Sequence, residues 1–193
     1  MLLWMPLFLG TELGFSTQQQ ANVLSLYEVG VVIGAILLGG ISDLLYSRRS
    51  PIGVVSILIS SAILFKIAFG YKSLSEGAFT TLLFFLGFFV GSLHHLIVIS
   101  ASADLGRQQT GKRATSTITG IIDGVGTSGA GSGQVVLGAT IEAYGWFSGY
   151  ILIIAVMTAL AILPLAKVFF REVREIRDIR RQRLAERAAE QSC

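Results

Sequence analysis

Two long runs of this chain contain no charged residue, and this feature constrains the fold more than any other. Residues 54–65 and 77–93 carry no Asp, Glu, Lys or Arg, and in the whole chain 14% of residues are charged while 52% are apolar. That is too little charge to cover a water-soluble domain of this length. Uncharged runs of this kind are typical of helices that cross a bilayer. The sequence therefore predicts an all-α integral membrane protein.

The polar segments between the apolar runs divide the chain into spans and loops. The first apolar run, residues 1–9, is much shorter than the roughly 20 residues that a span needs, and we interpret it as the outer end of a truncated first helix. A polar loop is expected at residues 10–20. Residues 1–170 thus form a transmembrane part, and residues 171–193 form a basic tail. The five full spans are expected at residues 21–46, 51–71, 77–102, 114–143 and 147–170.

Lysine and arginine gather on one side of the predicted bundle. The loops near residues 43–51 and 104–113 share that side with the tail, which holds seven arginines between Arg171 and Arg187, whereas the loops of the other side hold only Lys72. Basic loops stay on the cytoplasmic side of a membrane. The C-terminus is therefore predicted to be cytoplasmic.

The basic character of the chain does not indicate nucleic acid as a partner. Its net charge is +3, and the cations lie at span ends, where lipid headgroups and the insertion machinery explain them. The single cysteine, Cys193, is the last residue, which excludes an internal disulfide. We expect membrane lipid as a partner, no nucleic acid and no cofactor.

Three groups of ionisable residues stand out inside the predicted spans, where a charge costs a few kcal/mol and usually faces a cavity or a partner. Glu28 and Asp123 each lie near the middle of a span, and His94 and His95 lie about two thirds of the way along another. Two adjacent histidines point about 100° apart on a helix, so at most one of them faces a given cavity. Each carboxylate either lines a substrate path or pairs with a neighbouring helix, and both interpretations remain open.

These residues do not match a metal site or a catalytic set. His94 and His95 have no third ligand at a usable spacing, so no metal site is predicted. No combination of nucleophile, base and orienting group accompanies Asp104, Asp123 or the histidines. The chain is therefore not expected to be an enzyme.

Glycines recur at four-residue spacing in two of the predicted spans. The pairs are Gly120/Gly124 and Gly129/Gly133 in one span and Gly30/Gly34 in another. Small residues at this spacing let helices approach closely. A phosphate-binding loop is excluded because no Walker lysine follows and the segment continues as an apolar span. Close helix packing is the expected role of these glycines.

One loop carries a more specific pattern. Gly39 is followed four residues later by Asp43 and then by the basic pair Arg48 and Arg49. The aspartate can cap or pair with a helix end in one conformation, while the arginines hold the loop on the cytoplasmic side. This pattern resembles the conformational loop of the major facilitator superfamily. A generic basic loop is the alternative.

Three stretches together resemble the organophosphate:phosphate antiporter family of that superfamily, and most closely its eukaryotic sugar phosphate exchangers. They are Leu26-Tyr27-Glu28-Val29-Gly30 running to Asp43, Ser102-Ala103-Asp104-Leu105-Gly106 followed by residues 119–126, and Tyr144-Gly145-Trp146, an interfacial turn before the last span. The resemblance covers nearly the whole chain to Phe170. It implies the C-terminal six-helix half of a major facilitator transporter, with its first helix truncated.

The resemblance also implies a function, which is exchange of an organic phosphate, either a sugar phosphate or glycerol phosphate, for inorganic phosphate by alternating access. The substrate site would lie between two halves, so the missing N-terminal transporter half is an expected partner. The cations that bind phosphate in this family lie outside the sequence. The endoplasmic reticulum membrane is implied as a location. A non-transporting membrane sensor or an inactive fragment of the same family is the alternative.

The same resemblance points to candidate substrate-binding residues. Glu28 matches an acidic position beside the family's pocket, and Tyr27 and Asp123 are further candidates. His94 and His95 depart from the family pattern and are retained because they lie inside a span.

Overall fold

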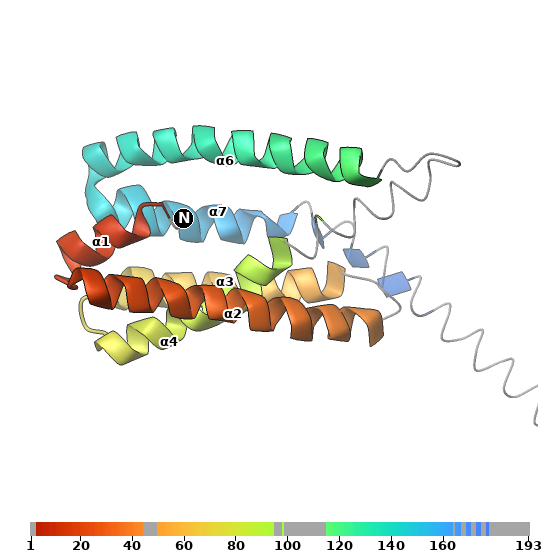
Figure 1. Ribbon diagram of the computed structural model, residues 1–193, viewed down its shortest axis with the longest axis horizontal. Helices are drawn as coiled ribbons and strands as arrows, with labels where there is room; N and C mark the ends of the chain where they lie inside the picture. The colour runs from red at the N-terminus through yellow and green to blue at the C-terminus, as the bar shows by residue number, and fades with distance from the viewer. Residues whose placement is uncertain are drawn as a thin grey trace, which may run out of the picture.

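The chain forms a bundle of helices (Figure 1). The computed structural model describes residues 3–44, 50–94, 98, 115–163, 165–166, 169–170, 173–174 and 177, and these include no β-strand. Its elements are α1 (Met5–Glu12), α2 (Thr17–Leu44), α3 (Ser50–Gly70), α4 (Glu76–Leu86), the π-helical turn η1 (Gly87–Gly91), α6 (Thr115–Trp146), the π-helical turn η2 (Phe147–Leu152) and α7 (Ile153–Leu160). The predicted all-α architecture is confirmed.

The helices run side by side with alternating direction (Figure 1). The connections from α1 to α2, from α3 to α4 and from α6 to η2 all lie at one end of the bundle, which we call the turn end. The C-terminal end of α2 and the N-terminal end of α6 lie at the opposite end. This alternation matches the two sides that the distribution of loops predicts.

Four helical segments of the described chain are long and apolar enough to cross a membrane, namely Thr17–Leu44, Pro51–Gly70, Glu76–His94 and Ser116–Leu160. The last of them contains a reversal, because Gly145 has φ 74° and ψ 178°, which are not helical values. Glycine adopts a positive φ without the steric penalty that other residues meet. The predicted turn at Tyr144-Gly145-Trp146 therefore separates α6 from η2 and α7. The last predicted span, residues 147–170, is described as η2 and α7 up to Leu160.

The polar loop expected at residues 10–20 is shorter than predicted. Helix α1 continues to Glu12 and α2 already begins at Thr17. The reason is a reciprocal cap, in which the Ser16 backbone N–H donates to the Gln19 side chain at 2.8 Å and the Gln19 backbone N–H donates to the Ser16 hydroxyl at 3.4 Å. Such a capping box satisfies free backbone donors and starts a helix early.

Helix α1 is held at the turn end by a cluster of aromatic rings. Phe8 is 1% exposed, and its ring centroid lies 5.6 Å from that of Tyr71, 6.4 Å from Phe79, 5.8 Å from Trp146 and 5.8 Å from Tyr150. Tilted ring pairs at these separations are favourable beyond the area that they bury. One side chain thus joins α1 to the ends of α3, α4, α6 and η2.

The Gly30/Gly34 pair packs closely, as predicted. A Cβ atom added to Gly30 would collide with the carbonyl oxygen of Phe84, and one added to Gly34 would collide with the carbonyl oxygen of Phe88. Helix α2 therefore lies against α4 and η1 with the two backbones in contact. Only glycine permits so close an approach.

Candidate functional site

Helix α2 presents Tyr27 and Glu28 to different surroundings. Tyr27 is buried at 6% exposure, whereas the neighbouring Glu28 is exposed. Successive helical residues point about 100° apart, so burial of one leaves the other on the open side. The Glu28 carboxylate makes no hydrogen bond in the part of the chain that is described. Its carboxylate is available to a partner across the open side of α2.

Helix α6 presents Asp123 on an open surface. Asp123 is exposed, and a Cβ atom added to Gly120, Gly124 or Gly126 would meet nothing within 4 Å. The same holds for Gly129, Gly131 and Gly133. The close approach predicted for Gly120/Gly124 and Gly129/Gly133 is therefore not made within the described residues.

Contacts of α6 with other elements concentrate at its C-terminal part. Trp4 lies over Gly138, and its indole N–H donates to the carbonyl of Gln134 at 3.3 Å. The Thr140 hydroxyl of α6 donates at 2.9 Å to the carbonyl of Gly149, which lies after the turn. The half of α6 that carries Asp123 extends past these contacts. This is the physical reason why its glycines face open space.

Of the two histidines, only His94 lies among the described residues. Its side chain is exposed and lines a groove of about 470 Å³ between α3, η1 and α7, with Thr158 as another polar lining residue. The remaining lining residues are apolar. His95 lies outside the described residues, so the relative orientation of the pair stays a prediction.

The loop pattern is described only in part. Gly39 and Asp43 belong to the last two turns of α2, and Asp43 is exposed. Arg48 and Arg49 lie outside the described residues. The pairing of Asp43 with a helix end therefore remains a prediction.

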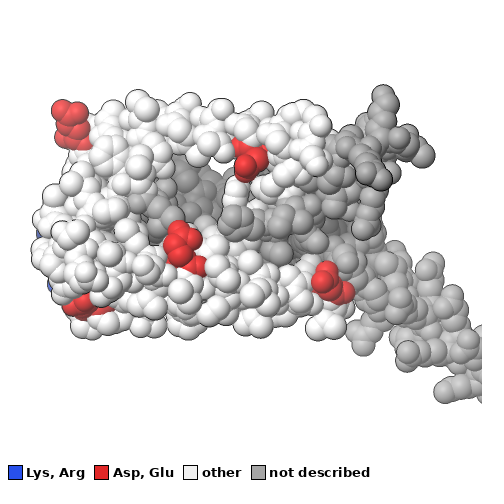
Figure 2. All heavy atoms as spheres, viewed as in Figure 1, with Lys and Arg blue, Asp and Glu red and all other residues white. Residues whose placement is uncertain are grey.

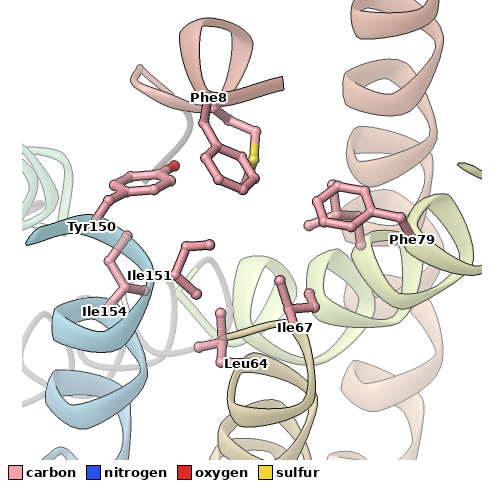
Figure 3. Close-up of a pocket in the computed structure, with 9 residues that line it drawn as sticks. Phe8, Leu64, Ile67, Phe79, Tyr150, Ile151 and Ile154 are labelled. Atoms are coloured by element: carbon pink, nitrogen blue, oxygen red, sulfur yellow. The ribbon is translucent and has the colours of Figure 1, made fainter. Parts of the chain in front are cut away.

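The enclosed gap near the turn end is not a substrate site. It measures about 10 Å³ and is lined by side chains from α1, α3, α4, η2 and α7. Figure 3 shows Phe8, Phe79, Ile67 and Tyr150 around it, with the aromatic rings facing inwards. A drug-sized ligand needs about 300 Å³ or more. The gap is a packing defect of the apolar core. The candidate site therefore lies on the side of the bundle where Glu28 and Asp123 are exposed, which we call the open side.

Among the described residues, the open side has little positive charge. Figure 2 shows the surface hollowed beneath α6, with acidic side chains standing apart and cationic ones only at the edge of the view. Lys66 and Lys72 lie in the last turns of α3 and just after it, at the turn end. Neither is near the middle of a span. Among the described residues there is also no group of three or more His, Cys, Asp or Glu that could hold a metal ion.

Sequence reasoning did not anticipate that Tyr27 is buried against glycine. A Cβ atom added to Gly91 would lie 3.2 Å from the Tyr27 Oη, and one added to Gly87 would lie 3.2 Å from the Tyr27 Cδ2. The spacing of Tyr27, Val31, Gly34 and Leu38, all buried, is that of one helix face. That spacing was the available signal.

A bundle of long apolar helices, with polar groups exposed on one side, indicates an integral membrane protein with several spans. The sequence profile of the Major Facilitator Superfamily matches residues 1–191, so the chain belongs to the Major Facilitator Superfamily. The chain is 33% identical over 185 residues to "Sugar phosphate exchanger 3" of Gallus gallus, which covers 94% of this chain and 36% of the relative.

Two further relatives agree. "Sugar phosphate exchanger 3" of Homo sapiens is 35% identical over 176 residues, covering 88% of this chain and 34% of the relative. "Glucose-6-phosphate exchanger SLC37A2" of Xenopus laevis is 33% identical over 181 residues, covering 91% and 35%. The chain thus spans about a third of the length of the curated relatives that it matches. No solved structure matches it.

Proposed function

We propose that this chain forms one wall of a transporter that exchanges an organic phosphate, a sugar phosphate or glycerol phosphate, for inorganic phosphate by alternating access. The supporting observation is its similarity, over most of its length, to relatives named as sugar phosphate and glucose-6-phosphate exchangers. Membership of a transporter superfamily also favours transport over enzymatic catalysis.

The open side of the bundle supports a site shared with a second wall. Glu28 and Asp123 are exposed inside spans, where an unpaired carboxylate is costly. A phosphate ligand needs cations, which the described middle of the bundle does not supply. We therefore assign the phosphate-binding cations to the missing N-terminal transporter half. Glu28 and Asp123 would organise those cations from this side.

The other candidate residues have more distant roles in this proposal. His94 faces a groove that opens beside η1, so either His94 or His95 reaches substrate or a proton. Tyr27, the buried neighbour of Glu28, supports the position of Glu28 from inside the bundle. Asp43, together with Gly39, Arg48 and Arg49, controls the change between inward-facing and outward-facing states at the cytoplasmic side.

The proposed placement follows from the same argument. The chain is the C-terminal half of the transporter, with residues 1–170 in the membrane and residues 171–193 as a cytoplasmic tail. The turn end then faces away from the cytoplasm. The endoplasmic reticulum membrane is the proposed location.

A flux measurement tests the function. The portion of a sugar phosphate exchanger that this chain does not cover is joined to it, and we call the product the restored exchanger. Liposomes containing the restored exchanger are loaded with inorganic phosphate, and uptake of labelled glucose 6-phosphate or glycerol 3-phosphate is followed. Uptake that requires internal phosphate supports exchange. A folded restored exchanger without uptake of either organic phosphate would indicate a sensor or an inactive member of the family instead.

A further inference from the structure

Three residues hold α2 and η1 together away from the open side, namely Tyr27, Gly87 and Gly91. We call these three residues the lock. We propose that Tyr27 is a positioning residue, which together with Gly87 and Gly91 fixes η1 on α2 and so sets the spacing between Glu28 and His94. This inference rests on the proposed function, in which Glu28 organises the cations that bind phosphate and His94 or His95 reaches substrate or a proton.

The tyrosine lies along the π-helical turn. The backbone carbonyl of Tyr27 occupies the place that a Cβ atom of Gly87 would take, and the Tyr27 Oη lies 3.2 Å from the position of a Gly91 Cβ atom. The side chain thus spans the two glycines that begin and end η1. At 6% exposure Tyr27 has no room for a substrate molecule. Its influence on the open side must act through the elements that it holds.

The contact is reciprocal, because α2 also contributes glycines. Gly30 and Gly34 of α2 meet the carbonyl oxygens of Phe84 and Phe88. Close Cα–H···O contacts of this kind recur where membrane helices approach each other. Glycines from both partners therefore allow backbone to rest on backbone, and a shift of one helix relative to the other would create collisions on both sides.

The π-helical geometry of η1 is supported locally. The Ser92 backbone N–H donates to the carbonyl of Gly87, five residues earlier. The Ser92 hydroxyl donates to the carbonyl of Phe88, and Ser92 is fully buried. Single π-helical turns occur frequently at functional sites. Because a π-helical turn takes up more residues than an α-helical turn, the residues after η1 point in another direction than a continuous α4 would give them.

Two candidate site residues flank this lock. Glu28 follows Tyr27 directly and points to the open side, and His94 lies three residues beyond the end of η1 and is exposed. Because the backbones between them are in contact, neither residue can move relative to the other unless the lock opens. Tyr27 therefore affects substrate binding without touching the substrate.

A rescue experiment in the restored exchanger tests the inference. Gly91→Ala places a Cβ atom against the Val31 Cγ2, and Val31→Ala removes that methyl group and leaves the Val31 Cβ at 3.4 Å. Gly91→Ala is expected to raise the KM for organic phosphate roughly tenfold, because overpacking at a tight contact forces the elements apart. Adding Val31→Ala is expected to return the KM to within about twofold of the unmodified protein.

Matched variants separate positioning from folding. Gly77→Ala, in the first turn of α4, meets nothing within 4 Å and serves as the glycine control. Tyr27→Phe retains the ring across η1 and is expected to retain the KM, whereas Tyr27→Ala is expected to raise it. All variants are compared at equal amounts of monodisperse protein, and their melting temperatures are measured in parallel.

The outcomes are distinguishable. An unchanged KM in a monodisperse Gly91→Ala protein would overturn the inference, and so would a raised KM that Val31→Ala fails to lower. If the unmodified restored exchanger shows no exchange, the proposed function fails and the lock is judged by melting temperature alone. In that case, a melting temperature that Gly91→Ala lowers and Val31→Ala restores supports the lock. A melting temperature that Gly91→Ala lowers and Val31→Ala does not restore overturns it.

Discussion

At the scale of single residues, neighbouring side chains on one helix have opposite environments. Tyr27 is packed against glycine while Glu28 is exposed, and on α6 Asp123 is exposed between glycines without neighbours. A carboxylate inside a span is costly unless a cation or water meets it. Glu28 and Asp123 are therefore the residues at which a change of charge without a change of shape is most informative.

Glu28→Gln in the restored exchanger is expected to lower the initial rate of exchange by at least about tenfold, or about 1.4 kcal/mol, because the neutral amide no longer organises the cations opposite. The rate is measured in phosphate-loaded liposomes at equal protein. Gln18→Glu, at an exposed position whose side chain donates to Asn22 of the same helix, serves as a control for a change of charge elsewhere on α2. Equal rates for Glu28→Gln and the unmodified protein would remove Glu28 from the site.

Asp123→Asn is expected to leave folding intact and to alter transport. The side chain is exposed in the described structure, so a substitution of the same shape disturbs no packing contact. Size-exclusion chromatography reports folding, and exchange measured across a range of pH reports function. A folded variant with an unchanged rate and pH profile would limit Asp123 to a structural role.

At the scale of elements, glycines have two different environments that the sequence does not distinguish. Gly34 faces the Phe88 carbonyl, whereas Gly126 faces open space. Alanine at Gly34 must push two backbones apart, and alanine at Gly126 only gains helix propensity. The same substitution should therefore change stability in opposite directions at the two sites.

Gly34→Ala is expected to destabilise the chain by about 1 to 3 kcal/mol, and Gly126→Ala to stabilise it by up to about 1 kcal/mol. Denaturant unfolding in detergent, followed by intrinsic fluorescence, gives both values. Similar changes for the two variants would contradict the close contact between α2 and η1.

Gly145→Ala is expected to destabilise the reversal between α6 and η2 by about 1 to 3 kcal/mol, because φ of 74° is unfavourable for a residue with a Cβ atom. Gly129→Ala is the control, since Gly129 is helical and has open space around it. Unfolding in detergent compares the two proteins. A Gly145→Ala chain as stable as the control would show that the turn tolerates another geometry.

The sequence predicts elements better than their ends and contacts. Apolar runs predict the spans because lipid requires them, and Gly145 predicts a turn because it stands between two such runs. The apolar pattern predicts the start of α2 too late, because the Ser16–Gln19 capping box begins the helix before the first apolar residue of the run. The π-helical turn η1 depends on contacts with Tyr27 and Val31, which are more than 50 residues away in sequence, and a local pattern does not contain them.

At the scale of the whole molecule, the turn end is closed while the side carrying Glu28 is open. The rings around Phe8 join five elements at that end. Exposed apolar side chains such as Val32, Ile36 and Val125 cover other faces, as expected for surfaces that contact lipid or a second helix layer. The bundle therefore depends on one end for much of its cohesion.

Phe8→Ala is expected to cost about 3 to 5 kcal/mol, because it removes the ring that all the others touch and leaves a cavity. Leu7→Ala is the matched control, since Leu7 is 50% exposed on the same helix. Thermal unfolding in detergent compares the two. A Phe8→Ala chain that unfolds together with the Leu7→Ala chain would show that α1 contributes little to the bundle.

The positions of the tryptophans also allow the turn end to be followed by intrinsic fluorescence. The sequence contains two tryptophans. Trp146 lies at the turn end beside Phe8 and Tyr150, and Trp4, at the start of α1, lies over Gly138 of α6. Their emission therefore reports on the turn end and on the neighbouring contact between α1 and α6. Opening or wetting of that end would shift the emission to longer wavelength, while movement at the opposite end would leave the spectrum unchanged, so the two ends can be told apart without a label.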